Sequence, residues 1–183
     1  MSDEIIIRQC APTLAAIKTG SLFSCPCRNR LELRSEIRLF NQKYVPKGLC
    51  LLPLRFWEER ALLLLFRPER LQRDLQNEMA RRLLKNAGYC SEDYCLCIVT
   101  LVRRFREGND FPHEVGLFLS YPPEDVKGFI ENKAEHYKCA GLWKVYGDEQ
   151  KAKQQFAAFR RCTELYRELW HAGIDFEQLA VPP

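Results

Sequence analysis

The chain has 183 residues, of which 46% are hydrophobic and 28% charged, with a formal net charge of +4. This composition argues against intrinsic disorder, and the length predicts a single domain over residues 1–183. No apolar run approaches the ~20 residues of a membrane span, and the N-terminal MSDEIII lacks the basic start and apolar centre of a secretory signal. We therefore expect a cytoplasmic protein that is not embedded in a membrane.

The basic residues are spread along the expected helices, where Glu or Asp accompanies most of them. A nucleic-acid-binding face would concentrate Lys and Arg on one surface, with aromatic residues between them. The densest cluster, Arg103, Arg104 and Arg106, falls near the expected end of a helix, where the helix dipole favours cations. The charge pattern therefore argues against a nucleic acid partner.

The nine cysteines are an odd number, and a reducing compartment is expected, so a disulfide framework is not predicted. Cys25 and Cys27 are too close in sequence for a zinc knuckle, and Cys95 and Cys97 would point about 200° apart on a helix. We expect several cysteines to pack as small apolar core residues and predict no metal site.

The first residues with possible chemistry lie near the N-terminus. Glu4–Arg8 contains three consecutive isoleucines and predicts a short buried strand, whereas Pro12 and Gly20 are typical of the start and end of a helix. This reading would place Cys10 at a helix N-terminus, where the positive end of the dipole lowers the pKa of a thiol. Cys10 is therefore a candidate nucleophile.

The next segments predict part of a sheet and one helix. Ser21–Phe23 favours a short strand, and the apolar spacing of Leu31–Tyr44 is helical. Leu49–Trp57 and Ala61–Phe66 predict a β-hairpin, in which Pro53 indicates an edge strand or a bulge. Because Ala61–Phe66 is apolar without alternation, we expect this strand to be covered on both faces.

The second half predicts alternating helices and strands. Gly128 would cost ~1 kcal/mol relative to Ala inside a helix, which indicates that another element packs closely against it. The pattern predicts an α/β fold in a single domain, with a mixed sheet, a β-hairpin and several packed helices. The expected helices are 68–87, 91–108, 122–132 and 148–173, and the expected strands are Val115–Leu119 and Leu142–Tyr146.

Three motifs carry a resemblance to a known family: CAPTLAAIKTGSLF (10–23), FPHEVGLFLSYPPEDVKGFIENK (111–133) and CAGLWKVYGD (139–148). They resemble an uncharacterised bacterial family, domain of unknown function 3793, found mainly in anaerobic Gram-positive bacteria. The similarity covers nearly the whole chain and brings no established activity or cofactor. Family genes often lie near flavodoxin and iron-uptake genes, so the resemblance implies at most a link to iron or redox metabolism.

The chain also departs from this family. Gln9 stands where family members commonly have His, and Tyr137 and Leu142 stand where they carry further cysteines around Cys139. If those cysteines bind a metal elsewhere in the family, most of that site is missing here. The resemblance therefore leaves the cofactor of this chain unknown.

Our preferred hypothesis is a binding or accessory protein linked to iron or redox metabolism. The expected strand ends near residues 113 and 143 would form a pocket with a few polar groups in an apolar lining. The occupant would be a small molecule or a partner protein. The candidate binding residues are His113, Tyr121, Cys139, Trp143 and Tyr146.

The alternative hypothesis is a cysteine-dependent hydrolase or transferase. Cys10 would attack as a thiolate, His113 would act as general base and acid, and Asp125 would orient the imidazole. Asn132 or Asp148 could take the third role. The order along the chain agrees with such an apparatus, but only proximity in space makes a triad.

Overall fold

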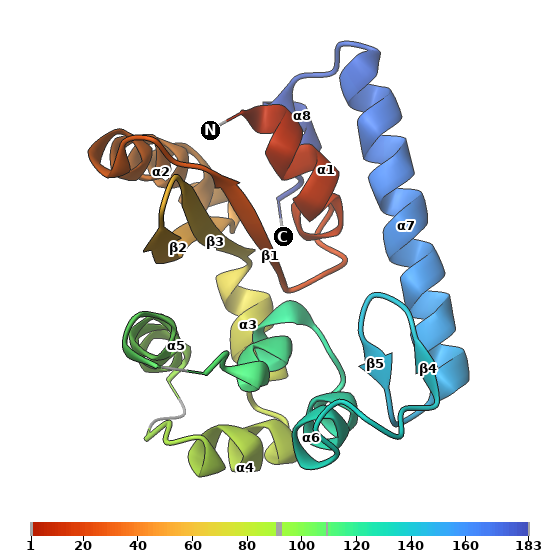
Figure 1. Ribbon diagram of the computed structural model, residues 1–183. Helices are drawn as coiled ribbons and strands as arrows, with labels where there is room; N and C mark the ends of the chain where they lie inside the picture. The colour runs from red at the N-terminus through yellow and green to blue at the C-terminus, as the bar shows by residue number, and fades with distance from the viewer. Residues whose placement is uncertain (1, 91–92, 109, 183) are drawn as a thin grey trace.

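The computed structural model describes residues 2–90, 93–108 and 110–182 (Figure 1). The expected α/β class is confirmed. The strands are β1 (Gly20–Pro26), β2 (Cys50–Trp57), β3 (Arg60–Phe66), β4 (Cys139–Ala140) and β5 (Lys144–Val145). The helices are α1 (Asp3–Leu14), α2 (Arg30–Tyr44), η1 (Val45–Lys47), α3 (Pro68–Asp74), α4 (Glu78–Asn86), α5 (Tyr94–Glu107), η2 (His113–Leu119), α6 (Pro123–Glu131), α7 (Glu149–His171) and α8 (Phe176–Leu179).

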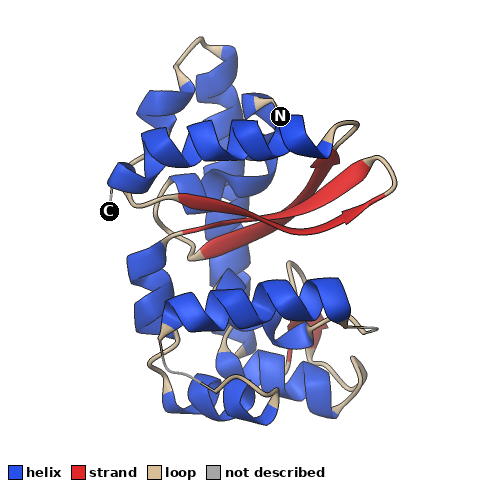
Figure 2. Ribbon diagram, turned by 90° about the vertical axis from the view of Figure 1, so that its left-hand side faces the viewer, coloured by secondary structure: helices blue, strands red, loops and turns tan. Residues whose placement is uncertain are grey.

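The main sheet has three strands in the order β1-β3-β2, and both of its strand pairs are antiparallel. It lies between two groups of helices (Figure 2): α1 and α2 pack on one face, and α5 and η2 on the other. In β3, Leu63 and Leu65 belong to the hydrophobic core on the face covered by α1 and α2. Leu64 and Phe66 belong to the core on the face covered by α5 and η2. The unbroken apolar run of this strand is thus explained, and the prediction that it is covered on both faces is confirmed.

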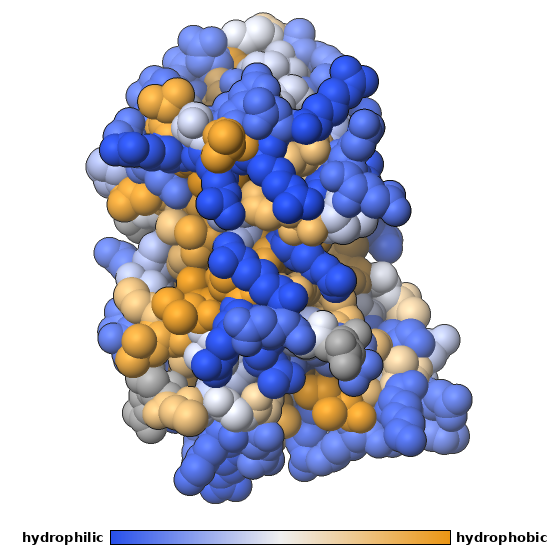
Figure 3. All heavy atoms as spheres, turned by 60° about the vertical axis from the view of Figure 1, so that its left-hand side comes forward, coloured by the Kyte–Doolittle hydropathy of each residue, from blue (hydrophilic) through white to orange (hydrophobic). Residues whose placement is uncertain are grey.

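The predicted hairpin is formed by β2 and β3, and Pro53 lies at an edge strand beside a register shift, as expected. Asn41 of α2 hydrogen-bonds to both backbone groups of Leu51 in β2. Its Oδ1 accepts from Leu51 N at 2.8 Å, and its Nδ2 donates to Leu51 O at 2.8 Å. The face of the molecule in Figure 3 has apolar patches within a largely hydrophilic surface. Leu39 of α2 and Val99 of α5 are among the exposed apolar side chains of the protein.

The N-terminal prediction is wrong, because Glu4–Arg8 is not a strand and no helix begins at Pro12. Both stretches belong to α1, whose buried face combines Ile6, Ile7, Cys10, Ala11 and Leu14 at helical spacing. Pro12 lies in the last turn, where it removes only one helical hydrogen bond. Its carbonyl accepts from Ile17 N and Lys18 N, both at 3.0 Å, which closes the turn into β1.

The expected strand Val115–Leu119 is also wrong. These residues lie in the 3-10 helix η2, and its residues from Glu114 to Leu119 are all buried, so no alternation distinguishes a strand from a buried helical turn. Gly116 allows the close packing: a Cβ there would lie 2.8 Å from Val126 Cγ2 and 2.9 Å from Tyr121 Cδ2. Ser120, with φ 65°, ends the element.

The expected helix 68–87 is divided into α3 and α4. Asn77 causes the break as the N-cap of α4, since its side chain accepts from Met79 N and Ala80 N. The helix expected from Ser91 begins at Tyr94, and Ser91 itself lies outside the described residues. The helices expected over Leu31–Tyr44, 122–132 and 148–173 are confirmed as α2, α6 and α7.

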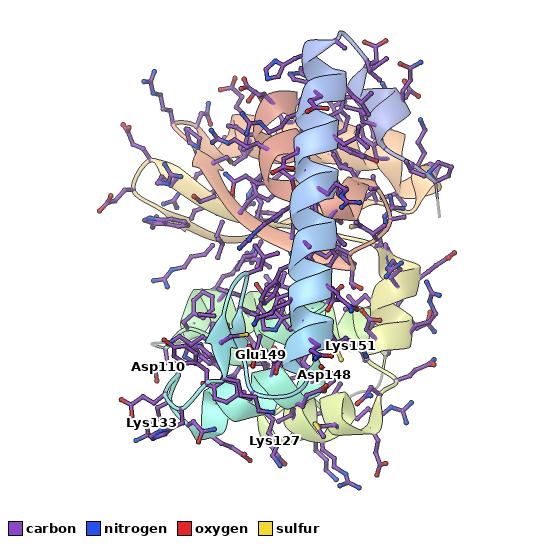
Figure 4. All side chains as sticks on the ribbon, turned by 90° about the vertical axis from the view of Figure 1, so that its right-hand side faces the viewer. Asp110, Lys127, Lys133, Asp148, Glu149 and Lys151 are labelled. Carbon is purple, nitrogen blue, oxygen red and sulfur yellow. The ribbon has the colours of Figure 1, made fainter. Side chains whose placement is uncertain are left out.

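The longest described helix, α7, passes α1 at one end and the β4–β5 hairpin at the other (Figure 1). It begins beside the hairpin (Figure 4), where Asp148 caps it by accepting from Lys151 N at 3.0 Å. The close packing expected at Gly128 is confirmed, because a Cβ there would clash with the ring of Tyr146. Among the described helices, α7 included, none has the length and apolar character needed to cross a bilayer.

Candidate functional site

A cavity of about 500 Å³ lies where four distant parts of the chain meet. Its walls come from the α1–β1 segment, η2 with its flanking residues, α6, and the loop between β4 and β5. Most of the exposed surface of the lining is apolar. We call this space the aromatic cavity, because its lining contains the aromatic side chains of Phe111, His113, Tyr121, Phe129 and Trp143.

His113 lies at the solvent-exposed rim of the aromatic cavity, at the start of η2. Its ring centroid is 5.6 Å from that of Phe111 and 4.9 Å from that of Phe129. The neighbouring Glu114 points into the protein instead, where it accepts hydrogen bonds from Tyr89 Oη and Arg104 Nε. These two adjacent residues therefore do not share one site.

Trp143 forms the inner wall and is held from three sides. Its ring is stacked on Tyr121 with 4.7 Å between centroids, and it meets Phe156 edge-on at 4.4 Å. Its Nε1 donates to Asp125 Oδ2 at 2.7 Å. The indole is therefore fixed in position before any ligand arrives.

Asp125 is buried in α6 and joins this helix to the hairpin. Besides Trp143, it receives hydrogen bonds at Oδ1 from Tyr146 N (2.7 Å) and Gly147 N (2.8 Å). Both carboxylate oxygens are thus engaged within the protein. This arrangement supports the wall of the aromatic cavity and does not orient an imidazole.

A protein-family model, "Protein of unknown function (DUF3793)", matches residues 6–180, a range that includes every residue lining the cavity. The chain belongs to this family. The resemblance drawn from the three sequence motifs is thereby confirmed. Searches of curated proteins and of solved structures gave no match to this chain.

Cys10 is buried with 0% exposure and does not line the aromatic cavity. It lies in the C-terminal half of α1, so the expectation that it begins a helix is wrong. Burial raises the pKa of its thiol, whereas a nucleophile would need a lowered one. Among the described residues no hydrogen bond joins Cys10, His113 and Asp125, so their catalytic roles stay a prediction without structural support.

The structure brings His113, Tyr121 and Trp143 to the cavity, but Cys139 and Tyr146 lie outside its lining. Cys139 begins β4 and packs against the core beneath the hairpin, and Tyr146 covers Gly128. Ligand binding by any of these five residues stays a prediction.

The family resemblance implies departures at Gln9, Tyr137 and Leu142. Gln9 and Leu142 line the aromatic cavity, whereas Tyr137 does not. Over residues 2–90, 93–108 and 110–182, no group of three or more His, Cys, Asp or Glu side chains could hold a metal ion. The polar side chains that line the cavity include those of Gln9, Lys18 and Ser21.

The sequence interpretation did not propose Phe111, Phe129 or Lys18, all of which line the cavity, and Lys18 is the charged one. It is partly buried in the cavity wall, and its Nζ lies 5.9 Å from the ring centroid of Tyr121 and 5.8 Å from that of Phe159. Burial lowers the pKa of this ammonium group to about 8. A signal was present in the sequence, because Lys18 is the sole charged residue between Gln9 and Cys27.

Proposed function

We propose that the protein binds a small organic molecule with a flat, largely apolar ring in the aromatic cavity. The observation that carries this proposal is the convergence of five aromatic side chains on one apolar space of about 500 Å³. Ligand sites typically occupy ~300–1,000 Å³ and combine an apolar lining with a few placed polar groups. Gln9, Lys18 and Ser21 supply such groups here.

The aromatic cavity is also preorganised. Asp125 and Tyr121 fix Trp143, and the packing of Tyr121 and Val126 around Gly116 fixes η2 against α6. A ligand would therefore order few side chains on binding, which reduces the entropic cost of association. This preorganisation favours a ligand-binding site over a packing defect between loosely packed elements.

The link to iron or redox metabolism implied by the family resemblance stays a prediction. The described residues offer no cluster of metal-ligating side chains, but an aromatic cavity suits a redox-active organic ring. The ligand we propose is therefore organic.

Titration with the neutral fluorescent probe N-phenyl-1-naphthylamine tests the proposal. We expect saturable binding at one site per chain with enhanced probe emission. Phe129→Ala, which removes one wall of the aromatic cavity, should weaken binding about tenfold, since an apolar side chain of this size contributes ~1.5–3 kcal/mol.

Ile130→Ala is the matched control, because Ile130 is the next residue of α6, is 41% exposed and does not line the cavity. Its probe affinity should equal that of the wild type. Absence of saturable binding, or equal affinities of Phe129→Ala and Ile130→Ala, would contradict the proposed function. Far-UV circular dichroism of each variant ensures that folded proteins are compared.

A further inference from the structure

A second cavity of about 430 Å³ continues from the aromatic cavity. The two share five lining residues: Gln9, Lys18, Ser21, Tyr121 and Leu142. Lys18 lies at the junction, because its Nζ is within 6 Å of the centroid of Tyr121, which lines both cavities, and of Phe159, which lines the second alone. The two spaces therefore form one continuous groove with a lysine at its middle.

The lining of the second cavity, which we call the cationic arm, comes mainly from α1 and α7. Arg8 projects from α1, and Arg160 and Arg167 project from one face of α7, since they are seven residues apart in the helix. With Lys18 these make four cations, against the single carboxylate of Glu164. The groove thus has one aromatic half and one positively charged half.

The cations of this arm lack the partners that charged side chains elsewhere have. In α7 itself Lys153 pairs with Glu149 at 2.6 Å, and Arg104 of α5 pairs with Glu114 at 2.6 Å. Within the described part of the chain, no ion pair is formed by any cation of the arm: Arg8, Lys18, Arg160 or Arg167. Four cations around one concave space create a positive potential that an anion would relieve.

We infer that the ligand of the aromatic cavity carries an anionic group, a carboxylate, sulfonate or phosphate, that lies in the cationic arm between α1 and α7. This inference rests on the proposed function and adds the charge and orientation of the ligand. Arg160 and Arg167 would bind the anion through their planar guanidinium donors. Lys18 would contact the ligand where its ring joins its charged group.

Two probes that differ by one charged group separate this inference from the proposed function. N-phenyl-1-naphthylamine is neutral, and 8-anilinonaphthalene-1-sulfonate is the same molecule with a sulfonate. We expect the sulfonate to bind about five- to thirtyfold more tightly at low ionic strength, because it forms two partly exposed ion pairs that the neutral probe lacks. This preference should decrease as salt is added.

The double variant Arg160→Gln/Arg167→Gln should lose most of this preference while binding the neutral probe as the wild type does. Glu164→Gln should act in the opposite direction and tighten sulfonate binding about two- to fivefold. Arg161→Gln is the matched control, because Arg161 is an exposed residue of the same helix outside both cavities. Glutamine preserves helix propensity at each position.

Equal binding of the two probes by the wild type would overturn the inference and leave the proposed function standing. The same holds if the double variant binds the sulfonate no more weakly than Arg161→Gln does. Failure of both probes to bind would instead contradict the proposed function. Competition by 1-naphthyl phosphate and 1-naphthoate then identifies the anion: the tighter competitor indicates phosphate or carboxylate, and absence of competition by both overturns the inference.

Discussion

The three-stranded sheet and the wall of the aromatic cavity are stabilised in different ways. Each residue from Leu63 to Leu65 in β3 is fully buried by apolar side chains from helices on one face or the other. The cavity wall contains the 3-10 helix η2 and a hairpin with only two residues in each strand, and Asp125 joins that hairpin to α6 through three hydrogen bonds. Loss of one side chain should therefore destabilise the sheet through lost packing and the wall through unsatisfied donors.

The largest effect is expected in the sheet. Leu64→Ala in the centre of β3 should lower the free energy of unfolding by about 2–5 kcal/mol, since Leu64 is 0% exposed and the substitution leaves a cavity. Urea unfolding followed by circular dichroism measures this loss. The neighbouring Leu62, which is only partly buried, provides the control, and Leu62→Ala should cost clearly less.

An effect of Leu64→Ala below ~1 kcal/mol would contradict the two-sided packing of β3. The folded fraction of Leu64→Ala should still bind N-phenyl-1-naphthylamine with wild-type affinity. Leu64 does not line the groove, so a loss of stability without a loss of binding would separate the two regions.

Substitution of Asp125 should lower the free energy of unfolding less than Leu64→Ala does, but it should weaken probe binding more. Asp125→Ala leaves the indole Nε1 of Trp143 and the backbone N–H groups of Tyr146 and Gly147 without their acceptor. A hydrogen bond to a charged group contributes ~1.5–3 kcal/mol, and local rearrangement of the hairpin should limit the total loss to about that of one such bond. Binding of the neutral probe should fall sharply, because Trp143 loses its position.

Asp148→Ala is the comparison for Asp125→Ala, since Asp148 follows the same turn but caps α7. It should cost ~1 kcal/mol and leave probe binding intact. Trp143→Phe, which removes the indole donor and part of the ring but leaves Asp125 in place, should weaken probe binding less than Asp125→Ala does. If Asp125→Ala kept wild-type affinity, the wall would not depend on this carboxylate.

The same contrast explains what the sequence could predict. In Ala61–Phe66, a continuous apolar run and the nearby Pro53 are local signals, and the two-sided strand and its edge neighbour followed from them. The strand predicted over Glu4–Arg8 was wrong because three consecutive isoleucines favour a strand when so short a segment is considered alone. The helical spacing appears only when Cys10 and Leu14 are included.

The site was less accessible to sequence reasoning because its contacts join distant segments. The sequence offers Asp125 as a group to orient an imidazole, but its partners lie about twenty positions away, at Trp143, Tyr146 and Gly147. Lys18 gains its surroundings only when Phe159 of α7 packs near α1. No local pattern encodes such a pairing. The sequence named His113, Tyr121 and Trp143 as candidates, but it did not name Phe129 or Lys18.

The smallest expected effect concerns Lys18 and depends on pH. The pKa of its ammonium group is about 8 in the folded protein, and its ordinary value, which applies to the unfolded chain, is 10.5. Between these pH values the unfolded chain therefore binds more protons than the folded protein does. The contribution of Lys18 to the unfolding free energy should therefore rise with pH from about 8 to 10.5. Lys18→Met should remove this rise and stabilise the protein near pH 7, on the order of 1–2 kcal/mol for a partly exposed group.

Other groups titrate in this range, so the difference between Lys18→Met and the wild type is the quantity to measure. Burial raises the pKa of Cys10 and of Tyr121 in the folded state, and such acids lower stability as pH rises, the opposite sign to Lys18. Both proteins contain Tyr121, so its contribution cancels in the difference. The charge of Lys18 lowers the pKa of the Cys10 thiol, so part of the difference comes from Cys10. Lys127→Met, which removes an exposed lysine of α6, is the control for the loss of a lysine from the surface. Urea unfolding between pH 7 and pH 10 gives the unfolding free energy of both proteins as a function of pH. If the two curves were parallel, burial in the groove would not destabilise the charged form of Lys18.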